Sequence, residues 1–286
     1  MLGIVAAIID GVLIGSVYGL AAMGLTLIWG VMNVVNLTHG AAIVAGMFAL
    51  YLLTAAIGLP PYATLPVILV GGFLVGVALY WIAVHRMVDR AHLMSLLSTF
   101  AVNLVVIGLG TAVLGTGLFN VPVTLPSVTW QRYTFSGTHI LAAALTALIA
   151  GLLYLFLYRT RPGKAVRAVA NNREAAELCG IPTTRVLSFA FGLGVALAGA
   201  AGMLIATMFP FTVLSGDAYQ LKSFVVTALG GLGNPAGALL GGVALGLIEG
   251  FAAQVMPVSW TLVIEFVLFV AVLLLFPRGV FALRRA

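Results

Sequence analysis

The polar residues with the most suggestive spacing in this chain lie in the stretch NVVNLTHG (33–40). Asn36, Thr38 and His39 follow one long apolar run and precede another, so they are placed to break a helix and to line a pathway. A gate or a structural turn near the cytoplasmic end of the first span is an equally good interpretation. A metal site is not expected, because no Cys, His or acidic residue stands at ligand spacing from His39.

Charged residues inside apolar segments form a second set of candidates, namely Lys222, Glu249 and Glu265. A charged side chain at the centre of a bilayer costs roughly 3 kcal/mol on insertion scales, so such residues face protein or water. We predict that Lys222 and Glu249 form a structural pair. Glu265 is an alternative partner for Lys222, and it is also the one acid placed to serve an ion-coupled carrier. Asn103 is a further polar group within an apolar run.

The glycine-rich run LGGLGNPAGALLGG (229–242) interrupts the apolar pattern. Small residues allow helices to approach closely in lipid, and tight packing is the simpler explanation for most of the 34 glycines. Around Gly231 and Gly233 the run also predicts broken backbone, which a membrane tolerates only beside protein or a water-filled cavity. These two glycines, with Glu249 and Glu265, are therefore pathway candidates.

The segment RTRPGKAVRAVANNREAAELCGIPTTR (159–185) is basic and helix-prone in an otherwise apolar chain. Asn172 is placed to cap a helix, and Glu174 stands in its first turn, where an acid favours the positive end of the helix dipole. Gly180 is placed to end that helix. The pattern predicts a helix over Arg173–Cys179, outside the membrane.

A second short helix is predicted over Lys164–Ala170, with Val166 and Val169 towards one side and Arg167 exposed. Most connections between helices are two to eight residues long, so two capped helices in one loop are more than a connector needs. The segment is either a docking surface for a cytoplasmic partner or a basic loop that sets orientation and touches lipid headgroups.

The elements that must position these residues follow from composition. The chain has 286 residues, of which 63% are hydrophobic and 7% are charged, whereas soluble domains carry about 25% charged residues. The chain is therefore predicted to be an all-α, polytopic membrane protein, with 1–286 as a single membrane domain. Its apolar runs predict about nine spans (eight to ten): 5–30, 40–58, 63–84, 93–115, 138–158, 186–209, 212–233, 237–255 and 258–276.

Basic residues predict how the spans are oriented, because short cytoplasmic loops carry an excess of Lys and Arg. Nine spans place three basic clusters on the cytoplasmic side and the N-terminus outside. These clusters are Arg86 with Arg90, the segment 159–185, and the tail residues Arg278, Arg284 and Arg285. The net charge of +6 is explained by this topology and does not indicate nucleic-acid binding.

No group of residues indicates catalysis. A Gly-x-x-x-x-Gly-Lys-Ser/Thr nucleotide loop is absent from the sequence, so we expect no ATP hydrolysis by this chain, no catalytic or cofactor-binding residues and no bound metal. The single cysteine, Cys179, excludes an internal disulfide.

Several stretches carry a family resemblance. Glu174-Ala175-Ala176 followed by Gly180 resembles the EAA-x-x-x-G core by which permease subunits of ATP-binding-cassette (ABC) importers dock on an ATPase. Four blocks, in the family's order, resemble LivH-type branched-chain amino-acid permeases: 11–41, 163–186, 222–250 and 276–281. One departure is Ala41, where relatives often carry an acid.

The resemblance implies an ABC importer permease in the cytoplasmic (inner) membrane of a bacterium or archaeon. Its implied partners are a second, LivM-like permease subunit, two cytoplasmic ATPases and an extracytoplasmic substrate-binding protein. The ATPase-coupling residues that it implies are Arg167, Asn172, Glu174, Ala175, Ala176 and Gly180. The implied cargo is a branched-chain or other hydrophobic amino acid. Urea, short amides or organic acids carried by the same family, and a stand-alone secondary transporter, stay open as alternatives.

Overall fold

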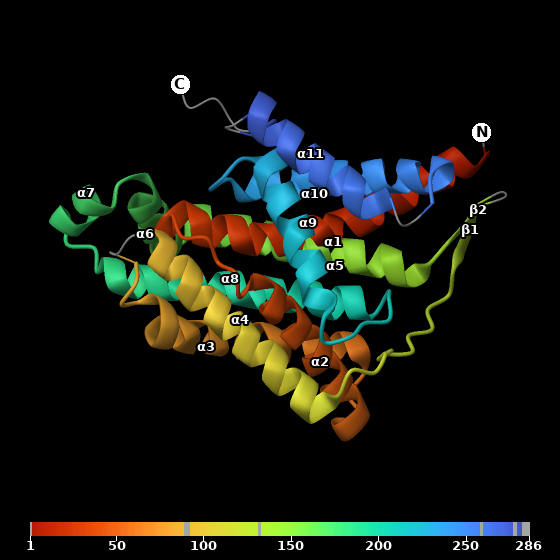
Figure 1. The fold of residues 1–286 in the computed structure, drawn as a ribbon, viewed down its shortest axis with the longest axis horizontal. Coiled ribbons are helices and arrows are strands. Elements are labelled where there is room, and N and C mark those ends of the chain that lie inside the picture. The colour runs from red at the N-terminus through yellow and green to blue at the C-terminus, as the bar shows by residue number, and fades with distance from the viewer. Residues whose placement is uncertain (1, 89–91, 131–132, 258–259, 277–278, 282–286) are drawn as a thin grey trace.

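The fold is a bundle of long helices (Figure 1). The computed structural model describes residues 2–88, 92–130, 133–257, 260–276 and 279–281. The elements in chain order are α1 (Leu2–Met32), α2 (His39–Ile57), η1 (Pro61–Thr64), α3 (Leu65–Leu79), η2 (Tyr80–Val84), α4 (His92–Leu114), β1 (Val128–Trp130), β2 (Tyr133–Phe135), α5 (Gly137–Arg159), α6 (Arg161–Asn171), α7 (Arg173–Leu178), α8 (Thr183–Ala206), α9 (Ser215–Gly230), α10 (Pro235–Val255) and α11 (Thr261–Leu275).

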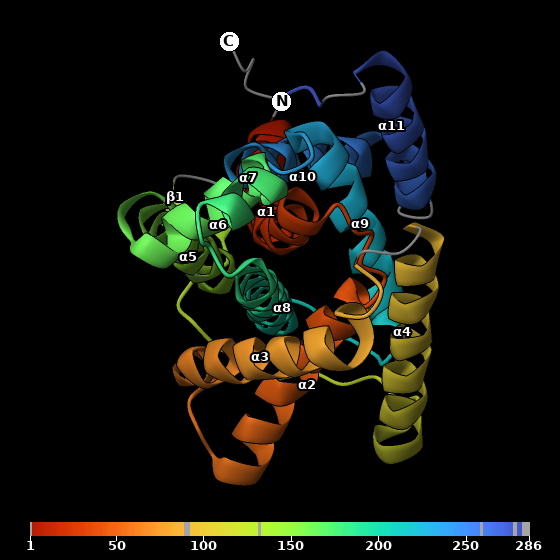
Figure 2. The same ribbon diagram turned by 90° about the vertical axis from the view of Figure 1, so that its left-hand side faces the viewer.

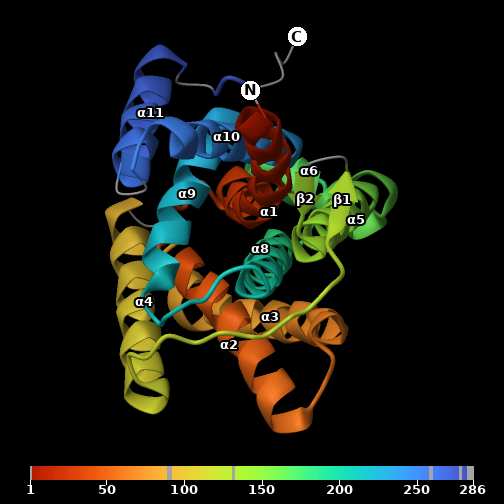
Figure 3. The same cartoon turned by 90° about the vertical axis from the view of Figure 1, so that its right-hand side faces the viewer.

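Helix α1 lies inside the bundle and packs against α5, α8, α9 and α10 (Figures 2 and 3). Its closest neighbour is α10, which runs antiparallel to it. A Cβ atom added at Gly15 would lie 2.5 Å from the carbonyl oxygen of Gly242, so the two backbones are nearly in contact. Lipid tails are as apolar as the helices, and close packing of small residues is what holds such a pair together.

Helix α8 is the second enclosed helix, and nearly all of its residues are buried. It packs against α1, α2 and α3. Again glycines set the distance: Gly46 of α2 lies against the backbone of Gly199, and Gly24 of α1 lies against that of Gly194. A displacement of α8 is therefore transmitted to both α1 and α2, because no flexible side chains lie between these backbones.

Seven described helical segments are long and apolar enough to cross a membrane, which confirms a polytopic helical membrane protein. They are Ala6–Met32, His39–Ile57, Pro61–Val84, Leu93–Leu114, Gly137–Arg159, Thr183–Ala206 and Pro235–Val255. The expected count of nine included α9 and α11, which have only 16 and 15 residues. At a rise of 1.5 Å per residue these two are about 24 Å long or less, short of a 30 Å hydrocarbon core.

One end of the bundle gathers the segments that were expected on the cytoplasmic side. Figure 1 shows α6 and α7 at the left, beyond the end of α1. The turn after α9 lies at the same end, because Gly233 packs against Gly30 near the end of α1. The described tail joins it: the backbone N–H groups of Val280 and Phe281 donate to the carbonyl of Leu229. The other tail and loop arginines, Arg90, Arg278, Arg284 and Arg285, lie outside the described residues.

Candidate functional site

Residues 33–38 form a break between α1 and α2, which we call the α1–α2 break. Asn33 is exposed, but Asn36, Thr38 and the first residue of α2, His39, are buried and expose 4% or less of their surface. The Asn36 side-chain oxygen accepts hydrogen bonds from the backbone N–H of Thr38 at 3.0 Å and from its hydroxyl at 2.5 Å. The predicted helix break at this stretch is therefore confirmed.

The depth of the α1–α2 break differs from the sequence-based expectation. His39 Nε2 lies 3.0 Å from the carbonyl oxygen of Ala21. Ala21 precedes the last residue of α1, Met32, by eleven residues, or about 16 Å of helix. Placing Asn36, Thr38 and His39 near the cytoplasmic end was wrong. The segment runs back along α1, so that α2 begins near the middle of the bundle.

A second helix begins at the same place. The backbone N–H of Gly40 donates to the Gln220 side chain of α9 at 3.0 Å. The first turns also touch directly, since a Cβ atom on Gly40 would lie 2.5 Å from the carbonyl oxygen of Gly216. Helix α4 also contacts this region, since the Thr99 hydroxyl accepts from the N–H of Leu37 at 3.2 Å. Two discontinuous helices thus start side by side inside the protein, an arrangement that transporters use to meet charged cargo.

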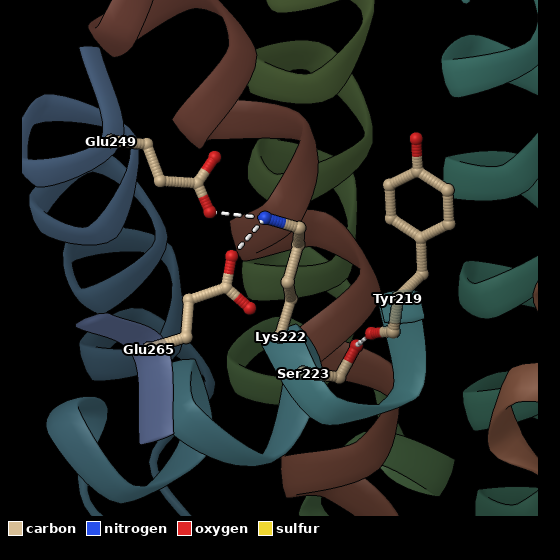
Figure 4. A network of polar contacts seen from close by, with 5 residues as sticks. All are labelled: Tyr219, Lys222, Ser223, Glu249 and Glu265. Carbon is tan, nitrogen blue, oxygen red and sulfur yellow. Dashed lines mark hydrogen bonds and ion pairs between the residues drawn. The ribbon is translucent and has the colours of Figure 1, made fainter. Parts of the chain in front are cut away.

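An ion cluster formed by Lys222, Glu249 and Glu265 joins α9, α10 and α11 (Figure 4). The Lys222 ammonium lies between the two carboxylates, bonded to Glu249 and, at 2.5 Å, to Glu265. The predicted Lys222–Glu249 pair is confirmed, and Glu265 is a second partner. The Lys222 nitrogen also lies 4.9 Å from the ring centre of Tyr18 on α1.

The ion cluster is largely shielded from solvent. The side chains of Lys222, Glu249 and Glu265 expose 13%, 16% and 2% of their surface. Buried charges persist only when they are paired, because desolvation costs several kcal/mol per ion. Glu265, the acid placed to serve an ion-coupled carrier, is thus engaged with a lysine of its own chain.

Gly231 and Gly233 form the turn between α9 and α10 and do not meet the α1–α2 break. Both have positive φ angles, 87° and 78°, which only glycine adopts without strain. Asn234 ends the turn and caps α10, its side chain accepting from the N–H of Gly237 at 3.1 Å. The predicted broken backbone is present, but it lies beside Gly30 at the end of the bundle.

The predicted Arg173–Cys179 helix is present as α7, which ends at Leu178. Asn172 caps it, its side chain accepting from the N–H of Ala175 at 3.0 Å. Gly180 ends it in a left-handed conformation, φ 77°. The N–H of Gly180 donates to the carbonyl of Glu177, and the N–H of Ile181 to that of Ala176, which together make a Schellman motif. Both ends of this two-turn helix are therefore fixed by local bonds.

Helix α6 attaches α7 to the bundle. Val166 and Val169 are buried, as their spacing predicted. Arg167 was expected to be exposed, but it is partly buried: its Nε donates to the carbonyl of Leu157 at 3.0 Å, and its guanidinium lies 4.2 Å from the ring centre of Tyr158. The end of α5 offers a free carbonyl and an aromatic ring, so Arg167 folds back onto it. Its bonds hold α6 in place on α5.

A protein-family model matches most of the chain. The family described as "Branched-chain amino acid transport system / permease component" matches residues 7–273, which include the α1–α2 break, the ion cluster, α6 and α7. The chain belongs to this family.

Named relatives match along almost the whole permease. LivH of Salmonella typhimurium, a high-affinity branched-chain amino acid transport system permease protein, is 27% identical over 290 residues, covering 95% of this chain and 93% of the relative. The probable LivH of Methanocaldococcus jannaschii is 30% identical, covering 96% and 91%. BraD of Pseudomonas aeruginosa is 26% identical, covering 96% and 94%. No solved structure matches the chain.

Sequence reasoning missed three residues of this permease. Leu178 is 91% exposed at the tip of α7, outside the apolar spans. The sequence already marked Leu178 as unusual, because burial in the core does not explain a leucine in a polar loop that is predicted to face water. Thr99 of α4 bonds to Leu37 in the α1–α2 break, and Gln220 of α9 bonds to Gly40 at the start of α2. They gave no local signal, because their partners lie 62 and 180 residues away.

Proposed function

We propose that this permease is a subunit of an ABC importer that moves branched-chain or other hydrophobic amino acids across the cytoplasmic membrane of a bacterium or archaeon. The observation that carries the proposal is α7, a capped and exposed helix on a chain of this permease family. Two separate cytoplasmic ATPases hydrolyse ATP and one of them binds α7, so the chain needs no nucleotide site. A second, LivM-like permease subunit completes the pathway, and an extracytoplasmic binding protein delivers the cargo.

Helix α7 is bonded directly to α8, one of the membrane-spanning helices. The Thr183 hydroxyl at the start of α8 donates to the Glu177 carboxylate of α7, and Glu177 also pairs with Arg173 at 3.8 Å. A partner that displaces α7 therefore pulls on α8, which lies backbone to backbone against α1 and α2. ATP binding shifts the permease between inward-facing and outward-facing access only if the ATPase binds α7 with a different affinity in each state.

The docking of α7 is tested with Leu178→Glu. A few residues near the centre of an interface carry most of its binding energy, and an unpaired charge buried there opposes binding. We expect ATP-driven uptake of radiolabelled leucine to fall at least about tenfold, which corresponds to about 1.4 kcal/mol of lost association energy. The permease itself should accumulate normally, because Leu178 contacts little within its own chain. Uptake by intact cells and co-purification of the ATPase are the measurements.

Leu178→Met is the matched control, since it keeps an apolar side chain of similar size at the same exposed position. It is expected to transport like the wild type. Glu174→Lys, on the same exposed helix, should weaken uptake in the same direction as Leu178→Glu. Full uptake and full ATPase association by both charged variants would refute the coupling role of α7.

The orientation is tested with the natural cysteine. Cys179 is the single cysteine of the chain, and it is exposed beside α7. A membrane-impermeant maleimide is expected to label it in inside-out vesicles and to leave it unlabelled in intact cells. Cys179→Ser supplies the background. Labelling in intact cells would place α7 on the outer side, where no ATPase can reach it.

A further inference from the structure

Three buried polar atoms near the start of α2 have no hydrogen-bond partner among the residues that the structure describes: Asn36 Nδ2, His39 Nδ1 and Asn103 Oδ1. Asn36 and His39 are fully buried, and Asn103 exposes 6% of its surface. Folded proteins leave few buried polar groups unpaired, because each loses its bonds to water without replacement. Three in one region require an explanation.

Two of the three atoms lie where α2 begins, since His39 is the first residue of α2 and Asn36 stands three residues before it. Asn103 comes from α4, one helical turn beyond Thr99, whose hydroxyl is bonded to residues 35 and 37. Residues four apart lie on the same face of a helix, and α4 is in contact with α2. Asn103 therefore lies on the face of α4 that packs against the α1–α2 break.

The bonding roles of the atoms are set by their neighbours. His39 Nε2 faces the carbonyl oxygen of Ala21 at 3.0 Å. A carbonyl only accepts, so Nε2 carries the hydrogen and Nδ1 is left as an acceptor. The Asn36 oxygen accepts from Thr38, so its NH₂ group is left as a donor. Asn103 presents a second acceptor oxygen.

We propose that this cluster is a transient binding site for the zwitterionic backbone of an amino acid, a step that rests on the proposed function. The cargo's carboxylate accepts from the Asn36 NH₂ group at the positive N-terminal end of α2. Its ammonium donates to His39 Nδ1 and Asn103 Oδ1. Each unpaired atom then has a partner of the matching kind.

Because the cluster has no formal charge, it favours a zwitterion over a cargo with a net charge. Asn36, His39 in its neutral form and Asn103 carry no formal charge, so a bound amino acid adds none to the membrane interior. A carboxylic acid or an amine of the same shape would bring one unpaired charge, which the membrane interior disfavours. The side chain of the cargo meets apolar groups, since Ile43 and Val44 on the next turn of α2 are buried hydrophobic residues.

The site is closed in this conformation, because Asn36 and His39 are fully buried. The contact between Gly40 of α2 and Gly216 of α9 seals one side of it. Because α2 also packs on α8, the helix that follows α7, movement at α7 reaches this seal through backbone contacts. Opening therefore separates the two helix starts and exposes the three atoms to the cargo.

The test is Asn103→Leu, in which an apolar side chain of similar size replaces the amide. If Asn103 serves only the cargo, the variant should accumulate in the membrane and resist heat at least as well as the wild type. Its uptake of radiolabelled leucine, per molecule of permease and with the natural partner subunits present, should fall at least tenfold. Asn103→Gln keeps a neutral acceptor oxygen and should lose less uptake than Asn103→Leu.

Each outcome decides the matter. Leucine uptake by Asn103→Leu within twofold of wild type would overturn the site, because the amide then serves no cargo. A loss of accumulation by Asn103→Leu would also overturn it, because the amide would then be needed for folding. Equal losses of uptake by the Leu and Gln variants would do the same. A wild-type complex that takes up no leucine would instead refute the proposed function.

Discussion

Lys222→Met is expected to remove most of the folded permease from the membrane. The substitution leaves the Glu249 and Glu265 carboxylates facing one another without the ammonium that lies between them (Figure 4). Removing one partner of a buried ion pair destabilises a protein by about 3–5 kcal/mol, a large part of the 5–15 kcal/mol that usually holds a domain folded. The measurements are the amount of permease in washed membranes and its thermal denaturation in detergent, where a fall of roughly 10 °C is expected.

Two further variants test whether the stability of the ion cluster depends on the charge of Lys222 or on the shape of its side chain. Lys222→Arg keeps the positive charge and should recover much of the accumulation. The triple variant Lys222→Met, Glu249→Gln, Glu265→Gln removes every charge of the cluster and should be more stable than Lys222→Met alone, because no carboxylate is left uncompensated. If Lys222→Met accumulates and denatures like the wild type, the ion cluster does not hold α9, α10 and α11 together.

Gly242→Val is expected to cause a loss of comparable size, for a steric reason. A Cβ atom at Gly242 would overlap the backbone of Gly19 and would lie 2.5 Å from the carbonyl oxygen of Gly15. Neither group can move aside without separating α1 from α10. Overpacking in a closely packed interior costs about 1–3 kcal/mol, and more where the obstacle is backbone. Accumulation should fall at least tenfold, measured by quantitative immunoblot of membranes.

The matched control is Gly151→Val in the apolar span α5. Gly151 is exposed, and a Cβ atom added there meets nothing within 4 Å. The two substitutions change helix propensity equally, so any difference between them reports the contact of α1 with α10. Equal accumulation of the two variants would contradict a backbone contact at Gly242.

The loop carrying α6 and α7 is the region where sequence reasoning reached furthest. Asn172 and Gly180 specify the ends of α7 through bonds to residues at most a few positions away. Such caps act locally, and so the spacing of residue types is enough to predict them. The exposure of Arg167 was mistaken because its partners belong to another helix, α5.

The pairing of Lys222 was partly predictable. An isolated lysine in an apolar segment must find an acid, and the chain offers few. That argument indicated Glu249, but it could not show that Glu265 is bound at the same time. Whether one or two carboxylates reach the same ammonium depends on how α10 and α11 pack beside α9.

Composition and local residue patterns are enough to predict a multi-pass helical membrane protein, a capped helix after the fifth long span, and a break after the first. Each of these properties follows from composition or from neighbouring residues. The depth of the break, by contrast, depends on how the helices pack. Residues 33–38 have no regular hydrogen bonding that sets their course, and they run back to the middle of the bundle because Leu37, His39 and Gly40 find partners there. Those bonds join helices distant in sequence, so the place where α2 and α9 begin together is a property of the packed bundle.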